Sequence, residues 1–222
     1  MRLQTKSNFI ISFQKYLYLI FVIFCVSYIS TLQYRPYPFS YIVKIIPILA
    51  LSLIPLLNIS GNKGKFIFTG LVFSALGDLL LAMEGNKFLI FGLGAFGFAL
   101  LMYILAFLRN VVLRRKRSIL LFVFIIYGLA IGYLITPNLG KMLIPVLIYL
   151  SLLIFLGISS VIGKDNNFLL IPGALLFMIS DSIIGINSFL IKIPNSSFWI
   201  MLTYFQAQFL IVLGSSIKKN NN

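Results

Sequence analysis

Residues Phe88 to Leu108 read FLIFGLGAFGFALLMYILAFL, a run of 21 residues without a charged side chain. A helix needs roughly 20 predominantly apolar residues to cross the hydrocarbon layer of a membrane. Gly85-Asn86-Lys87 precedes the run and Arg109 follows it, as expected for loops at both ends. This stretch predicts a transmembrane helix.

Seven similar windows lie on either side of this run. The predicted spans are approximately 14–32, 39–57, 66–84, 88–108, 118–136, 142–163, 168–191 and 197–217. Of the 222 residues 60% are apolar and 10% are charged, which is typical of membrane proteins. The strands of a membrane barrel would be about half as long and would alternate polar with apolar residues, unlike these runs. The sequence predicts an all-α fold, a polytopic bundle of eight transmembrane helices, in which residues 1–222 form a single transmembrane domain.

Short joins with loop-forming residues separate the spans, for example Asn62-Lys63-Gly64-Lys65 and Pro137-Asn138-Leu139-Gly140. The basic residues are distributed unevenly among these joins. Apart from Lys44, 13 lie at the two termini and in alternate loops: Arg2, Lys6, Lys15, Lys63, Lys65, Arg109, Arg114, Arg115, Lys116, Arg117, Lys164, Lys218 and Lys219. The other loops contain only Arg35, Lys87, Lys141 and Lys192. The positive-inside rule therefore predicts cytoplasmic N- and C-termini, which requires an even number of spans.

The net charge of +14 is explained by this topology, so we expect no nucleic acid partner. We expect a multi-pass protein of the bacterial inner (cell) membrane, in contact with membrane lipids. The cluster from Arg114 to Arg117 could bind anionic lipid head groups, although a role in topology is sufficient to explain it.

The residue inventory excludes several kinds of site. The chain has no histidine, one cysteine (Cys25) and four carboxylates, which excludes a Ser-His-Asp triad and a zinc site built by the protein. We therefore expect no metal and no cofactor.

Two of the four carboxylates lie inside apolar runs. Glu84 and Asp165 are at span ends, where water or lysines can solvate them, whereas Asp78 and Asp181 are within spans. An ionised carboxylate there costs about 2.5 to 3.5 kcal/mol on insertion scales, and such residues usually mark a functional site. Asp78 is six residues before Glu84 and Asp181 is six residues before Asn187, which places both in one layer roughly 9 Å inside the outer ends of their spans.

Four further polar residues are predicted at a similar depth: Lys44, Tyr149, Tyr204 and Gln208. These six side chains could converge in the outer half of the bundle. A buried ion pair between Lys44 and one aspartate that only fixes helix packing is the alternative, but it would leave the second carboxylate unpaired or protonated. The small residues near the acids, including Ser74, Gly77, Gly173, Ser182 and Gly185, we assign to close helix packing; Ser74 or Ser182 could also hydrogen-bond a neighbouring span.

Three segments carry a resemblance to a known family. They are Phe73-Ser74-Ala75-Leu76-Gly77-Asp78-Leu79-Leu80-Leu81 with Gly92-Leu93-Gly94-Ala95-Phe96 and Tyr103, then Gly173 to Ser182 with its Ser180-Asp181 pair, and Thr203-Tyr204-Phe205-Gln206-Ala207-Gln208. With Lys44 and Pro47 they resemble the YhhN family of lysoplasmalogenase-like membrane proteins, over residues 40–215. This chain departs from the family at Leu100, where many members have a histidine.

The resemblance implies an enzyme that hydrolyses the vinyl ether bond of lysoplasmalogens to a fatty aldehyde and a glycerophospho-base, so that a lysophospholipid is the expected substrate. This reaction needs an acid and a stabilising anion, which two buried carboxyl groups can supply. We expect Asp78 and Asp181 to be this pair, with their order unassigned. Tyr149, Tyr204 and Gln208 would orient water or the glycerol hydroxyl, and Lys44 would hold one aspartate ionised or contact the phosphate.

Two other functions fit the same residues. The first is a proton-coupled transporter of a lipid or small metabolite, in which the buried acids carry protons. The second, which we rank lowest, is a helical scaffold without catalysis. The sequence does not indicate the head group, the chain length or the oligomeric state.

Overall fold

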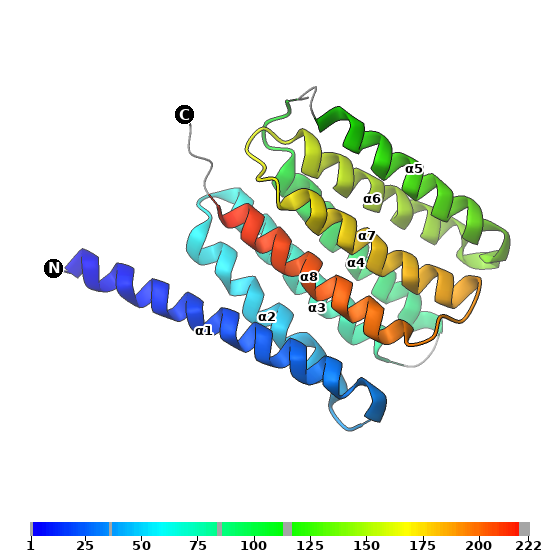
Figure 1. Cartoon of the computed structure of the whole chain (residues 1–222), viewed down its shortest axis with the longest axis horizontal. Coiled ribbons are helices and arrows are strands. Elements are labelled where there is room, and N and C mark those ends of the chain that lie inside the picture. Colours follow the sequence, from blue (N-terminus) through cyan, green and yellow to red (C-terminus); the bar gives the residue numbers. More distant parts are fainter. Residues whose placement is uncertain (1, 36, 84–85, 113–116, 218–222) are drawn as a thin grey trace.

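The structure is a computed structural model that describes residues 2–35, 37–83, 86–112 and 117–217. Eight long helices account for most of this part of the chain (Figure 1): α1 (Arg2–Ser30), α2 (Ser40–Asn58), α3 (Asn62–Leu81), α4 (Asn86–Phe107), α5 (Ser118–Ile135), α6 (Leu143–Ile162), α7 (Leu170–Phe189) and α8 (Ser196–Ser216). Short 3₁₀ turns occur at η1 (Leu32–Tyr34), η3 (Thr136–Asn138) and η4 (Gly140–Met142). All eight helices are long and apolar enough to cross a membrane, which confirms the predicted fold class.

The helices run up and down, so the bundle has two distinct ends. The start of α1 and the end of α8 lie at the left of Figure 1, and we call this the terminal end. The distal end, at the right, holds η1, η3 and η4 and was predicted to face outside. The largest helix contacts are between α3 and α4, α7 and α8, α2 and α3, and α1 and α2. The side on which each end lies remains a prediction.

Helices α1 and α5 form opposite edges of the bundle and are its least buried spans (Figure 1). Along α5, Ile119, Phe122, Ile126 and Leu129 are each more than 60% exposed. They follow one another at spacings of three and four residues and so share one helix face. Such a face would be unfavourable in water, whereas lipid tails solvate it readily. The arrangement fits a membrane as the solvent.

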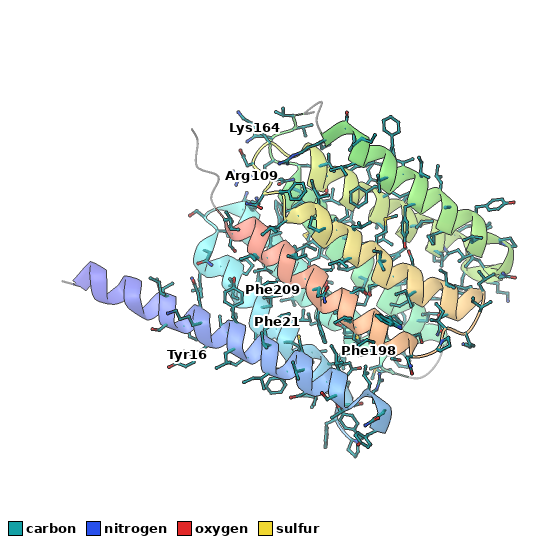
Figure 2. All side chains as sticks on the ribbon, viewed as in Figure 1. Tyr16, Phe21, Arg109, Lys164, Phe198 and Phe209 are labelled. Atoms are coloured by element: carbon teal, nitrogen blue, oxygen red, sulfur yellow. The ribbon has the colours of Figure 1, made fainter. Side chains whose placement is uncertain are left out.

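Aromatic rings attach α1 to α8. The rings of Phe21 and Phe209 stack with their centroids 5.7 Å apart, and Tyr18 meets Phe209 edge to face at 5.8 Å (Figure 2). Near the distal end, Tyr28 and Phe205 make a third contact of this kind. These rings add to the contacts that α1 makes with α2.

One predicted join was wrong, because Asn62 to Lys65 form the first turn of α3. Lysine side chains can extend along a helix towards water, so a basic pair does not require the helix to begin after it. Gly64 fits this position closely, since a Cβ atom there would lie 2.4 Å from the carbonyl oxygen of Ile59. The predicted end of this span at Glu84, and the basic residues Arg114 to Lys116, lie outside the described residues.

At the terminal end, backbone hydrogen bonds join the loop after α4 to the loop after α6. Asp165 lies there and accepts a hydrogen bond from Asn110 Nδ2 at 3.1 Å. Arg109 and Lys164 extend from the same two loops (Figure 2). Asp165 is thus a polar residue in a loop, as expected from the sequence, and it is at the opposite end of the bundle from η1, η3 and η4.

Two glycines of α3 bring α4 close to it. A Cβ atom on Gly70 would lie 2.3 Å from the Tyr103 ring, and one on Gly77 would lie 2.5 Å from the Phe96 ring. Both rings therefore lie directly against the α3 backbone, and a larger residue would displace them. Gly77 has the packing role that the sequence predicted, and it positions Phe96 beside Asp78.

Candidate functional site

Lys44 and Asp78 form an ion pair between α2 and α3. Lys44 Nζ lies 2.7 Å from Asp78 Oδ1, and the two side chains are 12% and 4% exposed. Among the described residues, the second carboxylate oxygen of Asp78 has no hydrogen-bond partner. The ion pair expected for one of the two aspartates therefore forms with Asp78, and it leaves one acceptor of that carboxylate unused.

A tyrosine and a glutamine link α4 to α8 next to this pair. The Tyr103 hydroxyl donates to Gln208 Oε1 at 2.8 Å and lies 3.4 Å from Ser74 Oγ of α3. Tyr103, Gln208 and Ser74 are all completely buried. A buried network of polar side chains stabilises a bundle only when its members have hydrogen-bond partners. Tyr103 satisfies this condition and joins three helices at one point.

The Tyr204 hydroxyl lies beside Asp78 and Gln208. Within the described part of the chain, neither this hydroxyl nor Gln208 Nε2 makes a hydrogen bond of normal geometry. Together with Asp78 Oδ2 they make three buried polar atoms that have hydrogen-bonding capacity to spare. Buried polar groups usually have partners, so this location, which we call the polar recess, suits a water molecule or a substrate hydroxyl.

Asp181 has a different environment on the other side of Phe96. The Tyr149 hydroxyl of α6 donates a hydrogen bond to Asp181 Oδ2. The described residues place no lysine or arginine in contact with this carboxyl group. Asp181 and Tyr149 instead line a cavity whose other walls are mostly apolar.

Phe96 separates the two carboxyl environments. Its ring lines the cavity and also packs edge to face on Tyr204, with centroids 5.9 Å apart. The carboxyl groups of Asp78 and Asp181 nevertheless lie close enough to interact electrostatically. The six polar residues predicted to converge therefore come together as two neighbouring groups, one closed around Asp78 and one facing a cavity at Asp181.

The serines near Asp181 differ from what the sequence suggested. Ser182 was a candidate for bonding a neighbouring span, but its hydroxyl donates to the Met178 carbonyl of its own helix at 2.7 Å. Ser180 makes the link between helices, donating to the Ile200 carbonyl of α8 at 3.1 Å. The sequence alone does not show which of the two serines bonds to another helix, because both residues are in one helix and flank the same acid.

Sequence reasoning also missed Tyr28 and Arg35. Arg35 donates to the Tyr28 hydroxyl at 2.9 Å, and its guanidinium lies 5.7 Å from the centre of the Tyr28 ring. The Tyr28 side chain is 1% exposed and is near enough to Lys44 and Asp78 to interact with both electrostatically. The only available signal was a tyrosine near the outer end of the first span, and tyrosine is common at that position in membrane helices.

The arrangement can perform acid chemistry without a nucleophile. It provides one carboxylate paired with a cation, one carboxyl group without a cation, and hydroxyl and amide groups between helices. In the described residues no three histidine, cysteine or carboxylate side chains come together. Acid and electrostatic catalysis are therefore the chemistries that these side chains can carry out by themselves.

Comparisons with known proteins agree with the motifs. Over 191 residues the chain is 31% identical to lysoplasmalogenase TMEM86A of Bos taurus, which covers 79% of this chain and 78% of the relative. It is 29% identical over 181 residues to lysoplasmalogenase TMEM86B of Homo sapiens, covering 80% and 75%. The lysoplasmalogenase of Mycobacterium tuberculosis is 30% identical over 160 residues, covering 69% and 61%. No solved structure matches the chain significantly.

The model of the YhhN family matches residues 39–215, which include α2 to α8 almost entirely and leave out α1. All residues described above around Asp78 and Asp181 lie within the matched segment, except Tyr28 and Arg35, which precede it. This match, with the relatives above, confirms the resemblance seen in the motifs. The chain belongs to the YhhN family and is lysoplasmalogenase-like.

Proposed function

We propose that this protein is a lysoplasmalogenase, which hydrolyses the vinyl ether bond of a lysoplasmalogen to a fatty aldehyde and a glycerophospho-base. One observation carries the proposal: two carboxyl groups lie near each other inside the bundle, and among the described residues only Asp78 has a cationic partner. The relatives named lysoplasmalogenase support the reaction class. Acid hydrolysis of a vinyl ether requires an acid and a stabilising anion, and the two aspartates can supply both.

The reaction begins with transfer of a proton to carbon. The acid gives its proton to the vinyl carbon that bears the alkyl chain, and the other vinyl carbon becomes an oxocarbenium ion with the ether oxygen. Water adds to that carbon and returns a proton to the carboxylate, which forms a hemiacetal. The hemiacetal then breaks its bond to the glycerol oxygen, which takes up the hydroxyl proton as the aldehyde forms. One water is consumed and the acid is regenerated.

The surroundings of the two aspartates suggest how they divide this work. Lys44 compensates the charge of Asp78, so Asp78 is suited to remain an anion and stabilise the oxocarbenium ion. Asp181 is paired with a tyrosine hydroxyl in an apolar cavity, where the neutral acid is favoured. Asp181 is therefore the proton donor in this proposal. Glycosidases divide the work of two carboxyl groups in the same way.

The polar recess supplies groups for the water that attacks. Asp78 Oδ2, the Tyr204 hydroxyl and Gln208 Nε2 have hydrogen-bonding capacity to spare among the described residues. A water molecule bound there could accept from Gln208 and donate to the Asp78 carboxylate. Tyr103 holds Gln208 in place through its hydrogen bond to Oε1. The anion would thus both orient the water and stabilise the cation.

Purified protein in detergent tests the function directly. We expect it to release a fatty aldehyde from a lysoplasmalogen and no fatty acid from the ester-linked counterpart, as followed by mass spectrometry. In D₂O the aldehyde should carry one deuterium on the carbon next to its carbonyl, because the enzyme protonates that carbon. Release of no aldehyde would contradict the proposal and favour a proton-coupled transporter, which needs a sealed compartment to be assayed.

A further inference from the structure

The cavity at Asp181 extends beyond the residues that the reaction needs. Its walls come from α4, α5, α6 and α7, with contributions from the end of α3 and from η4. The polar side chains that line it are Asp181, Tyr149, Ser182 and Ser188, and all the others are apolar or glycine. Because the Ser182 hydroxyl already bonds within its own helix, the carboxyl group and Tyr149 are the main polar feature at the inner part of the cavity.

The cavity reaches the surface of the bundle at its distal end. Ser188, which lies two turns beyond Asp181 on α7, lines the cavity and is exposed. The cavity volume is about 80 Å³, roughly half of the about 150 Å³ of a cavity that holds a benzene molecule. It therefore has room for only the first carbons of a hydrocarbon chain, and the rest of a long chain has to leave it towards the surface or the lipid.

We propose that this cavity binds the hydrocarbon chain of a single-chain lipid, beginning at the carbons next to the Asp181 carboxyl group, and that Gly185 sets which chains fit. The inference deepens the function proposed above and depends on it. An apolar channel with one carboxyl group inside it matches a ligand that is hydrocarbon except at its reactive bond. A head group with a phosphate would find no cationic side chain among the described residues of these walls.

Gly185 can determine which hydrocarbon chains fit because it lines the cavity and has free space where a side chain would be. It is four residues after Asp181 and so lies on the same face of α7, one turn nearer the distal end. A Cβ atom on Gly185 would meet only Ile135 Cδ1, at 3.7 Å, an ordinary contact with another residue of the cavity wall. A side chain can therefore be added into the cavity without a clash with the backbone. At Gly128, by contrast, a Cβ atom would lie 2.4 Å from Ile154.

Gly185→Leu adds a side chain to the cavity one turn beyond the acid, and Gly94→Leu is its matched control. Gly94 is in the middle of α4 and exposed, and a Cβ atom there would meet nothing within 4 Å. Both substitutions replace glycine by leucine inside a helix, so their effects on helix propensity are alike. They differ in whether the new side chain enters the cavity.

The assay compares kcat/KM for lysoplasmalogens with a sixteen-carbon and a four-carbon alkenyl chain. We expect Gly185→Leu to lower kcat/KM for the long chain by about 10- to 100-fold, which corresponds to the cost of forcing extra methylenes into a filled site. The short chain should lose much less, so that the ratio of the two substrates changes. Gly94→Leu should keep the wild-type ratio. Hexadecanal, the product with the long chain, should inhibit the wild type and Gly94→Leu more strongly than Gly185→Leu.

The failures of the two proposals can be told apart. If wild-type protein released no aldehyde from either substrate, the proposed function would fail and the chain site with it. If the wild type cleaved both and folded Gly185→Leu kept the wild-type ratio and hexadecanal inhibition, the cavity would not be the chain site and the function would stand. Should Gly185→Leu not fold, Gly185→Ala adds a single methyl group at the same place, and an unchanged ratio there would also overturn the inference.

Discussion

The two aspartates inside the bundle have the same side chain and different surroundings. Asp78 is 3% exposed, bound to Lys44 and enclosed by α2, α3, α4 and α8. Asp181 has Tyr149 as its partner and faces an apolar cavity. Phe96 lines the cavity at Asp181 and packs edge to face on Tyr204, which lies beside Asp78. In the proposed function, charge compensation at Asp78 and its absence at Asp181 allow the first to act as the anion and the second as the acid.

The proposed reaction needs both groups. A lone carboxyl group in a dry site would be neutral and could donate a proton, but it could not stabilise the cation that follows. A lone ion pair would stabilise charge and could not supply the proton. In the proposed reaction the two groups lie at different places along one substrate, so that the proton would move on one side and the charge would be stabilised on the other. Substitutions should therefore have different consequences on the two sides.

The largest effect is expected for Asp181→Asn. It removes the proton donor and keeps an oxygen that can accept the Tyr149 hydrogen bond. Aldehyde release should fall by about 10³- to 10⁴-fold, near the upper end of what general acid catalysis contributes. The thermal unfolding midpoint in detergent should change little. Near-normal turnover of a folded variant would remove Asp181 from the mechanism.

Asp78→Asn should lower turnover by about 10²- to 10³-fold, as for loss of an electrostatic stabiliser. Unlike Asp181→Asn, it should also destabilise the protein, by about 3–5 kcal/mol, because Lys44 is left as an uncompensated buried charge. The double variant Lys44→Met with Asp78→Asn should regain most of the stability and none of the activity. Thermal unfolding and aldehyde release, measured on the same samples, separate the two effects. Equal stability of Asp78→Asn and wild type would argue against a buried ion pair.

Tyr149→Phe tests how the acid is held. The variant removes the hydroxyl that donates to Asp181 and leaves the ring in the cavity wall. We expect a decrease of about tenfold in kcat, since one hydrogen bond to a carboxyl group contributes roughly 1.5 kcal/mol. The control is Tyr133→Phe on α5, where the side chain is 83% exposed. If both tyrosine variants behaved alike, the Tyr149 hydroxyl would have no part in catalysis.

Tyr103→Phe should have the smallest effect. It breaks the hydrogen bond to Gln208 and the longer contact with Ser74, and a net loss of about 1 kcal/mol in unfolding free energy is expected for one such bond. Turnover should fall only a few-fold, because Gln208 loses one hydrogen bond but stays at the same position on α8. Tyr16→Phe, at a side chain that is 64% exposed, serves as the control. A loss as large as that of Asp181→Asn would assign Tyr103 a direct role.

Most of the fold could be predicted from the sequence, because the membrane imposes a length on every apolar run. The eight spans are found in the structure, and their ends differ from the prediction by a few residues. Helix α1 begins at Arg2, twelve residues before the predicted span, and α3 begins at Asn62, where Asn62 to Lys65 had been predicted to form a loop. Charge and glycine indicated a loop there, whereas the lysine side chains and the close contact with Ile59 are compatible with a helix.

For the candidate site, the sequence predicted how deep the polar residues lie in the membrane but not which way their helix faces point. Counting residues from span ends placed Lys44, Asp78 and Asp181 in one layer, but the faces of the helices decide which carboxyl group meets the lysine. That choice depends on the rotation of α2, α3 and α7 about their axes, which is set by packing such as that of Phe96 against Gly77. The cavity was not predictable at all, since Gly185 was assigned to packing and lines open space instead.

The protonation states of the two aspartates at neutral pH test the central claim most directly. Infrared spectroscopy of the purified protein distinguishes a protonated carboxyl group from a carboxylate by its C=O stretching band. We predict a protonated carboxyl band in the wild type that Asp181→Asn removes and Asp78→Asn retains. A band that disappears in Asp78→Asn and persists in Asp181→Asn would contradict the assignment of acid and anion.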